Sequence, residues 1–351
     1  MNYLPGITSH YIQTARLKMH YIVYGPADGI PVVLIHGNLS TGRFYEHVMP
    51  NAPAGYCFIM PDMRGFGDTE RLPIDATRGL RDWADDTYSL VQALGIKQPV
   101  HLAGWSTGGA AIAAYAMDRP AQVASLTFID PVSPYGFGGT HLDGTPCYPD
   151  FAGSGGGTGN QEFAQSIANG DRSAESPLSP RNVINSSYWA ASHREPAERE
   201  DMLVGEILKS VTGDDGYPGD LTPSANWPGI APGTRGILNA LSGKYCNWAG
   251  IADISPKPPI LWVHGSTDIV VADGSAWEMG TLGKMGIVPG WPGDEVFPPQ
   301  MMVTQIRNVL QRYAERGGKL QMEMFEGAGH GPMFDSAQRF GDTFFKYIST
   351  K

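Results

Sequence analysis

Apolar residues fall along the chain in short continuous runs that are separated by longer amphipathic stretches. Continuous runs of this length, rich in Val, Ile and Leu, are typical of strands that are buried on both faces of a parallel sheet. The runs occupy residues 31–36, 56–61, 99–103, 123–130, 259–264 and 319–325. Residues 9–14 and 17–24 instead alternate apolar and polar side chains, which predicts an antiparallel strand pair near the start of the chain.

The amphipathic stretches between these runs predict helices. In residues 79–95, Leu80, Trp83 and Leu90 recur at helical spacing, and Gly95 ends the pattern. The other predicted helices of this kind cover residues 41–52, 107–117, 300–316 and 333–349. The alternation of strands and helices predicts an α/β fold, in which a mostly parallel eight-stranded sheet carries helices on both faces.

Two segments interrupt this alternation. Residues 133–257 are rich in Gly, Pro, Ser and aromatic residues, with helical pieces only near 196–211 and 234–243, and residues 273–300 form a second irregular excursion. We therefore expect one α/β core, made of residues 1–132 and 258–351, with a lid inserted at 133–257. The glycine-rich piece at 153–159 lacks the Lys-Ser/Thr ending of a phosphate loop and follows no strand, so it indicates a flexible lid segment.

The composition narrows the class of partner. The chain has 351 residues and a net charge of −10, which argues against nucleic-acid partners and leaves no polybasic patch for a membrane surface. No apolar run approaches the roughly 20 residues of a membrane helix. No signal peptide is visible, so we expect a cytoplasmic protein or a secreted chain already in its mature form. The three cysteines are too few for a disulfide framework.

One serine stands where a nucleophile is expected. Residues 104–108 read Gly-Trp-Ser-Thr-Gly, between the strand at 99–103 and the helix at 107–117. A serine at such a strand-to-helix turn occupies strained backbone geometry with an exposed hydroxyl, and glycines two residues away on each side avoid a clash. We therefore predict that Ser106 is a nucleophile rather than an ordinary turn residue, flanked by Trp105.

A serine hydroxyl needs a base, and the base needs an acid. Of the nine histidines, His330 lies in the loop between the last strand and the last helix, at the carboxyl edge of the sheet that also bears Ser106. For the acid, Asp268 follows the penultimate strand and Asp130 ends the strand after the nucleophile helix. Both can reach the histidine, and Asp268 is the preferred candidate.

Two further sets of residues complete the predicted site. The oxyanion requires two donors, for which we expect the backbone N–H groups of Thr107 and of Asn38, the latter in the turn after the strand at 31–36. Aromatic residues of the lid either form a small core of their own or line an apolar substrate pocket. The candidates for the pocket are Trp105, Tyr135, Phe137, Trp189 and Trp248. No metal-ligand spacing is present, and we expect neither a metal nor an organic cofactor.

These residues together resemble the α/β-hydrolase superfamily, in its serine-nucleophile branch of esterases and lactonases. The matching pieces are His36-Gly37-Asn38, Asp62 to Thr69 (Asp-Met-Arg-Gly-Phe-Gly-Asp-Thr), Gly104 to Gly108, Asp268 and Gly329-His330, in the family's order. In that family the stretch 62–69 is mostly structural. Haloalkane dehalogenases and epoxide hydrolases that resemble this fold use an aspartate nucleophile. A serine at position 106 therefore disfavours both activities.

The resemblance implies acyl transfer to water, with Ser106 attacking a carbonyl carbon and His330 taking its proton. We expect a hydrolase that cleaves a bulky, largely apolar ester or lactone through an acyl-enzyme. Three alternatives stay open: a C–C bond hydrolase, a lyase of the hydroxynitrile-lyase type, and a non-catalytic ligand-binding protein on the same fold. The sequence does not decide the oligomeric state.

Overall fold

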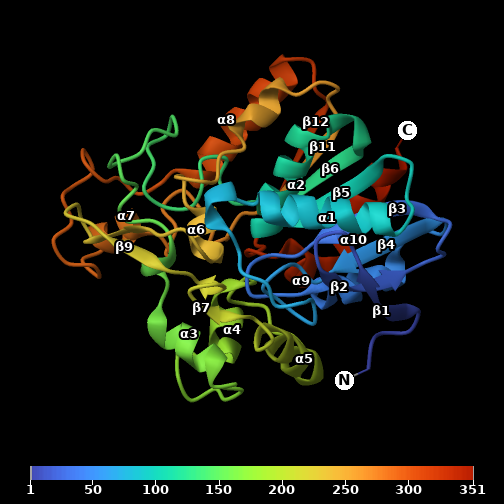
Figure 1. The fold of residues 1–351 in the computed structure, drawn as a ribbon, viewed down its shortest axis with the longest axis horizontal. Coiled ribbons are helices and arrows are strands. Elements are labelled where there is room, and N and C mark those ends of the chain that lie inside the picture. The colour runs from blue at the N-terminus through green and yellow to red at the C-terminus, as the bar shows by residue number, and fades with distance from the viewer. Residues whose placement is uncertain (1, 351) are drawn as a thin grey trace.

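The protein is built on one eight-stranded sheet, seen in a computed structural model that describes residues 2–350 (Figure 1). The strand order is β1-β2-β4-β3-β5-β6-β11-β12, in which β2 runs antiparallel to both β1 and β4 and all other neighbours are parallel. The strands are β1 (Ile7–Gln13), β2 (Lys18–Tyr24), β3 (Ile30–Ile35), β4 (Tyr56–Pro61), β5 (Val100–Trp105), β6 (Val123–Ile129), β11 (Ile260–Gly265) and β12 (Leu320–Phe325). The predicted fold class and strand pattern are confirmed.

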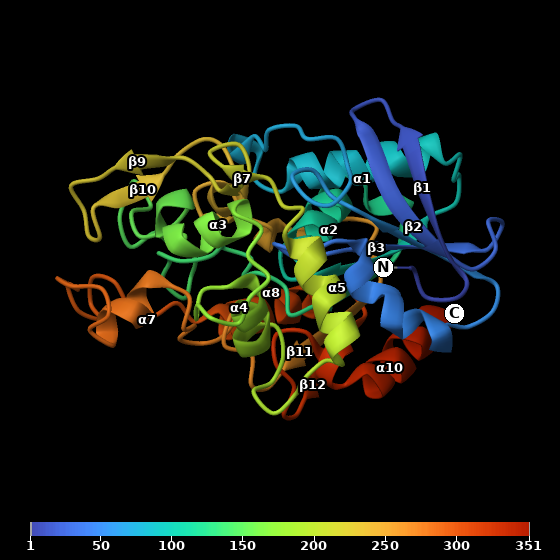
Figure 2. The same ribbon diagram turned by 90° about the horizontal axis from the view of Figure 1, so that it is seen from below.

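Helices cover both faces of this sheet (Figure 2). On one side α1 and α2 pack together, and on the other α10 packs on the 3₁₀ helix η1. The bounds in the core are η1 (Gly42–Asn51), η2 (Ala76–Arg78), α1 (Arg81–Ala93), α2 (Thr107–Asp118), η3 (Pro120–Gln122), α8 (Met302–Glu315), α9 (Pro332–Asp335) and α10 (Ala337–Ser349). The apolar face of α10, which includes Phe340 and Phe344, is buried.

Two predicted helices are refined by the structure. The predicted helix at 41–52 is present as the 3₁₀ helix η1, and it contains Pro50, which has no N–H to donate to the helical ladder. The predicted helix 333–349 is divided into α9 and α10 at Ser336, whose φ of −129° lies outside the helical region.

A lobe beside the core is formed by residues 133–257 together with 273–300 (Figure 1). Its elements are η4 (Gly156–Thr158), α3 (Gln161–Ala168), α4 (Pro180–Ser187), α5 (Ala197–Ile207), β7 (Thr212–Gly213), β8 (Tyr217–Pro218), β9 (Leu221–Pro223), β10 (Ile230–Pro232), α6 (Ile237–Leu241), η5 (Ala249–Asp253) and α7 (Met279–Lys284). Helices α3, α4 and α7 were not predicted. The two segments pack on each other, since the rings of Trp227 and Phe297 lie 4.9 Å apart and Trp227 Nε1 donates to the oxygen of Pro289.

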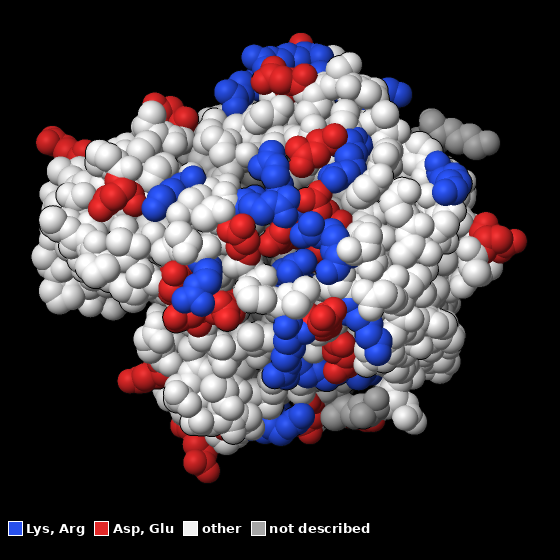
Figure 3. All heavy atoms as spheres, viewed as in Figure 1, with Lys and Arg blue, Asp and Glu red and all other residues white. Residues whose placement is uncertain are grey.

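The surface carries charges of mixed sign. Figure 3 shows Lys and Arg interleaved with Asp and Glu over the core, whereas the lobe on the left of that view is largely uncharged. Around α1, for example, Arg78 pairs with Asp82 and Asp85, and Arg119 pairs with Asp85. Within residues 2–350, no helix is both long and apolar enough to span a bilayer. The cysteines are all free.

Candidate active site

Ser106 sits at the turn between β5 and α2 with strained backbone dihedrals, φ 54° and ψ −116°. The two flanking glycines have no room for a side chain. A Cβ on Gly104 would lie 2.3 Å from the carbonyl oxygen of Gly108, and a Cβ on Gly108 would lie 2.3 Å from the carbonyl oxygen of Ile35. The geometry that the motif predicts is therefore present, and α2 begins directly after the serine.

The predicted base and one of the two predicted acids are hydrogen bonded. Nδ1 of His330 lies 2.8 Å from Oδ2 of Asp268, and both side chains are buried. The other oxygen of Asp268 accepts the N–H groups of Val270 (2.7 Å) and Val271 (3.1 Å), which fixes the carboxylate. Because a carboxylate only accepts, Nδ1 carries the proton and Nε2 is left as the basic nitrogen of the ring.

His330 is also held by contacts with Trp105. Its carbonyl oxygen accepts the indole N–H of Trp105 at 2.7 Å, and the rings of Trp105 and His330 lie 5.5 Å apart. In the same loop, Gly329 N and the lid residue Ala190 N donate to one oxygen of Asp335, at 2.8 and 2.7 Å. The loop that bears the histidine is thus tied both to the nucleophile strand and to the lid.

Asp130, the rival acid, takes a different place. It follows β6, and its Oδ1 accepts the N–H of Gly265 at 2.8 Å rather than a proton from His330. The two acids also differ in charge. Burial alone would raise the pKa of Asp268, but the charge and hydrogen bond of His330 hold it below its usual value. Burial and the nearby Asp268 raise the pKa of Asp130 well above its usual value.

The loop after β3 carries the predicted oxyanion donor Asn38. No acceptor among residues 2–350 takes the backbone N–H of Asn38, and Thr107 is the first residue of α2, so its N–H has no partner within the helix. The loop is held by Tyr188 of the lid, whose hydroxyl donates to the carbonyl oxygens of Asn38 (3.2 Å) and Leu39 (3.1 Å). Leu39 has a positive φ of 49°.

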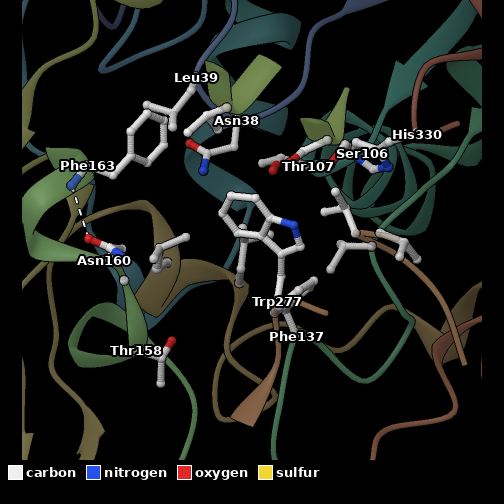
Figure 4. A pocket seen from close by; sticks show the side chains of 18 of the residues that line it. Asn38, Leu39, Ser106, Thr107, Phe137, Thr158, Asn160, Phe163, Trp277 and His330 are labelled. Carbon is white, nitrogen blue, oxygen red and sulfur yellow. Dashed lines mark hydrogen bonds between the residues drawn. The ribbon is translucent and has the colours of Figure 1, made fainter. Parts of the chain in front are cut away.

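A cavity of about 490 Å³ opens in front of these residues. Ser106, Thr107 and His330 lie at one end of it, Asn160 and Phe163 at the other, and Trp277 stands between them (Figure 4). The remaining wall is mostly apolar and comes from both parts of the lobe and from the loop after β11. Its apolar members include Leu39, Val132, Phe137, Leu178, Val183, Leu238, Leu241, Val270, Val271, Ala276, Met279, Leu282 and Ile287.

The aromatic residues predicted for the pocket divide into two groups. Trp105 and Phe137 line the cavity. Tyr135, Trp189 and Trp248 do not, so their prediction needs correction. The hydroxyl of Tyr135 accepts a hydrogen bond from Arg312 beside a separate surface hollow.

The two tryptophans are part of the packing instead. Trp189 is buried, its ring lies 5.6 Å from that of Phe334, and its backbone packs against the loop of His330. Trp248 stacks on Phe128 at 5.3 Å and donates to a backbone oxygen at 3.1 Å. Both side chains thus pack the lobe against the α/β core, since Phe334 belongs to α9 and Phe128 to β6.

Sequence reasoning missed two residues of the cavity wall. Trp277 belongs to the second excursion, where no periodicity marked it, and its indole N–H has no acceptor within the described chain. Tyr188 was not among the candidates for the pocket, although it lines the cavity and holds the loop of Asn38. The residue type itself could have marked Trp277, because exposing a large apolar side chain in a glycine-rich loop is costly and suggests that it covers or lines a pocket.

A second row of Ser, His and Asp lies where β1, β2 and the end of β4 meet. Ser9 Oγ is 2.9 Å from His20 Nε2, and His20 Nδ1 is 2.7 Å from Asp62 Oδ2. Ser9 is exposed on β1 and does not line the cavity, so no substrate pocket accompanies this row.

Two groups of His and carboxylate side chains have ligand atoms within 4.8 Å of one another in residues 2–350. They are His20 with Asp62 and Asp68, and His330 with Asp130 and Asp268. In each group Nδ1 of the histidine is already bonded to a carboxylate, and Lys209 forms an ion pair with Asp68 at 2.6 Å. These hydrogen bonds and this ion pair therefore occupy Nδ1 of both histidines and one oxygen of Asp68.

Comparison with known proteins gives the same fold. A family model described as alpha/beta hydrolase fold matches residues 30–146. The chain is 35% identical over 117 residues to a cis-3-alkyl-4-alkyloxetan-2-one decarboxylase of Xanthomonas campestris pv. campestris, which covers 31% of this chain and 39% of the relative. It is 34% identical over 113 residues to lipase 1 of Psychrobacter immobilis, with 32% and 35% covered. The matches thus span less than half the length of these curated relatives.

Solved structures extend the likeness to the whole chain. An esterase from Rhodococcus sp. ECU1013 superposes with a TM-score of 0.58 over 98% of this chain and 99% of that one, at 18% sequence identity. At this identity the likeness shows the fold, including the topology that brings the turn after β5 and the loops after β11 and β12 to one edge of the sheet.

Proposed function

Since the chain belongs to the α/β-hydrolase superfamily, we propose that it is a serine hydrolase that cleaves a neutral, largely apolar ester or lactone through an acyl-enzyme. The observation that carries this proposal is the hydrogen-bonded pair Asp268–His330, whose histidine lines the same end of an apolar cavity as Ser106. A cavity of about 490 Å³ is within the range of sites for compounds of drug size.

The proposed reaction follows from the protonation of the row. Nε2 of His330 takes the hydroxyl proton of Ser106 as the oxygen attacks the substrate carbonyl, and Asp268 stabilises the imidazolium that forms. The backbone N–H groups of Asn38 and Thr107 donate to the oxyanion. His330 then gives its proton to the leaving alcohol, and water cleaves the acyl-enzyme by the reverse steps.

The cavity supports a substrate without charge. No Asp, Glu, Lys or Arg is among the side chains that line it in the described chain, so an ionic substrate would lose its hydration without gaining a partner. Of the relatives, the decarboxylase of X. campestris is named for a four-membered lactone with alkyl groups, and the Psychrobacter protein is named a lipase. Both names concern neutral compounds with apolar chains.

A substrate panel tests the proposal. Purified wild type and Ser106→Ala are assayed with alkyl and aryl esters, a dialkyl four-membered lactone, a diketone and a cyanohydrin. We expect ester or lactone hydrolysis that Ser106→Ala abolishes. Faster turnover of the diketone or of the cyanohydrin would replace the proposal with a C–C hydrolase or a lyase, and no turnover would favour a binding protein.

Covalent labelling separates the two serine rows. A fluorophosphonate should label wild type and Ser9→Ala equally and fail to label Ser106→Ala. Labelling that is lost in Ser9→Ala and kept in Ser106→Ala would contradict the assignment of the nucleophile.

A further inference from the structure

Asp130 is a buried acid with an unused carboxyl oxygen. It directly follows β6, it is fully buried, and its φ of 40° lies in the left-handed region that non-glycine residues rarely adopt. Its Oδ1 accepts the N–H of Gly265, but no donor within residues 2–350 reaches Oδ2. A strained, buried residue with an unsatisfied polar atom indicates a function that justifies its cost.

The neighbour of the Asp130 carboxyl group is the acid of the proposed catalytic row. A carboxylate oxygen of Asp130, one of Asp268 and a ring nitrogen of His330 all lie within 4.8 Å of one another. Two ionised carboxylates at this separation repel each other unless a cation balances them. Of the ion pairs in the described chain, none brings a Lys or an Arg to either acid.

The other titratable neighbours do not supply that cation. Nδ1 of His264 lies 3.6 Å from Oδ1 of Asp130, but the ring donates from Nε2 to the oxygen of Val271 at 3.0 Å, and burial lowers the pKa of His264. A neutral ring with its proton on Nε2 fits both observations. From α9, Asp335 adds a further negative charge.

We propose that Asp130 carries a proton and donates it from Oδ2 to the Asp268 carboxylate, which extends the row to Ser106–His330–Asp268–Asp130. The proposal rests on the function proposed above for the first three residues. Asp130 is then a positioning residue, because it does not line the cavity. It fixes the Asp268 carboxylate toward His330 without adding a second negative charge, and its Oδ1 anchors it to β11.

The protonation states of the two acids agree with this arrangement. Burial raises the pKa of Asp130 well above its usual value, and the negative charge of Asp268 raises it further. Burial also acts on Asp268, but there the contact with His330 and the N–H of Val270 outweigh it and lower the pKa. One acid is neutral and the other ionised, a division that adjacent carboxyl groups commonly adopt.

The test reads the charge directly and needs no substrate. Asparagine at position 130 keeps an oxygen for Gly265 N–H and places an NH₂ where the proposed O–H lies, so Asp130→Asn mimics a neutral acid. The His330 ring is titrated by NMR in wild type, Asp130→Asn and Asp268→Asn, with His330→Gln to assign its signal. Infrared spectra of wild type minus Asp130→Asn at neutral pH report the protonated carboxyl group.

We expect the difference spectrum to show the C=O band of a protonated acid, and the titration midpoint of His330 to stay within about 0.3 pH unit of wild type in Asp130→Asn. Asp268→Asn, which removes an ionised carboxylate, should lower that midpoint by about one pH unit or more. A comparable fall in Asp130→Asn, or a carboxylate band in place of the acid band, overturns the proposal.

Steady-state kinetics of Asp130 variants provide a second test. On an ester that wild type cleaves, Asp130→Ala should lose at least about tenfold in kcat with KM unchanged, and Asp130→Asn should rescue kcat to within about threefold. Full activity of a folded Asp130→Ala would refute the positioning role. If no substrate is found, the proposed function fails while the spectra still decide the proton on Asp130.

Discussion

In mild acid, the free energy of unfolding should fall less in His36→Gln than in wild type. His36 is buried in the turn that leads to Asn38. Its Nδ1 lies 2.7 Å from the carbonyl oxygen of Gly37, and its Nε2 accepts the N–H of Met63 at 2.9 Å. The ring is therefore the neutral tautomer with its proton on Nδ1, and a second proton on Nε2 would oppose the N–H of Met63.

Burial lowers the pKa of His36 from 6.5 to about 4. The folded state thus binds this proton less readily than the unfolded chain, so its contribution to stability is complete above pH 6.5 and is lost as the pH falls toward 4. The lowered pKa corresponds to about 3 kcal/mol in total, most of which is lost between pH 7.5 and 4.5.

Urea unfolding of both proteins between pH 7.5 and 4.5 measures this loss. Glutamine does not titrate and can still accept the N–H of Met63, so the fall in the free energy of unfolding should be smaller in His36→Gln than in wild type by about 2–3 kcal/mol. The other buried histidines titrate alike in both proteins and cancel in the comparison. Parallel stability curves across this range would refute a neutral, desolvated His36.

Four substitutions test other parts of the site. Tyr188→Phe removes a hydroxyl that is hydrogen bonded to two backbone oxygens of the loop of Asn38. Urea unfolding should show a free energy of unfolding lower by about 1–2 kcal/mol, and steady-state kinetics should show a kcat lower by roughly tenfold. Asp268→Asn should lower kcat by roughly 10³–10⁴ because the amide cannot hold the reactive tautomer, and a loss below about tenfold would contradict its role as the acid. Trp277→Ala opens the middle of the cavity, so the kcat/KM ratio of long-chain to short-chain esters should rise on the order of tenfold, whereas an unchanged ratio would place the acyl chain elsewhere. Gly108→Ala brings a Cβ to 2.3 Å from a backbone oxygen of β3, so the free energy of unfolding should fall by more than about 2 kcal/mol in thermal unfolding. In the control Gly250→Ala the new Cβ would meet nothing closer than 3.7 Å, and the free energy of unfolding should stay within about 0.5 kcal/mol of wild type.

The sheet could be predicted because its signal is local. The strand β3 reads Ile-Pro-Val-Val-Leu-Ile, and only a strand covered on both faces accommodates such a run in this setting. The helices α3 and α4 escaped prediction because each is only eight residues long and lies between Gly-, Ser- and Pro-rich stretches. Their caps, Asn160 and Ser179, are visible in the sequence but are also common loop residues.

The site was predictable where the backbone itself forces residue choice. Glycines at 104 and 108 mark the turn of Ser106, because any side chain there would meet a carbonyl oxygen. The sequence favoured Asp268 as the acid but left Asp130 open, since both follow strands that end at the same edge. The role of the acid depends on which carboxylate is hydrogen bonded to His330, and tertiary packing decides which one that is.

The cavity wall was the least predictable part. Composition marked the lobe as aromatic, but whether a tryptophan faces the cavity or the interior depends on the path of loops that have no periodicity. Trp248 faces Phe128 in the core, whereas Trp277, in a segment without a clear pattern, faces the cavity.

The loop after β11 gives this protein a natural site for engineering. Asp268 lies near the start of that loop and is anchored there by its own backbone contacts, whereas Trp277, Leu282 and Ile287 follow it along the same stretch of chain. A chimera that exchanges 273–300 for the equivalent segment of another hydrolase would alter the fit of the acyl chain and leave the acid in its register. Libraries confined to this one contiguous stretch could therefore diversify selectivity without disturbing the chemistry.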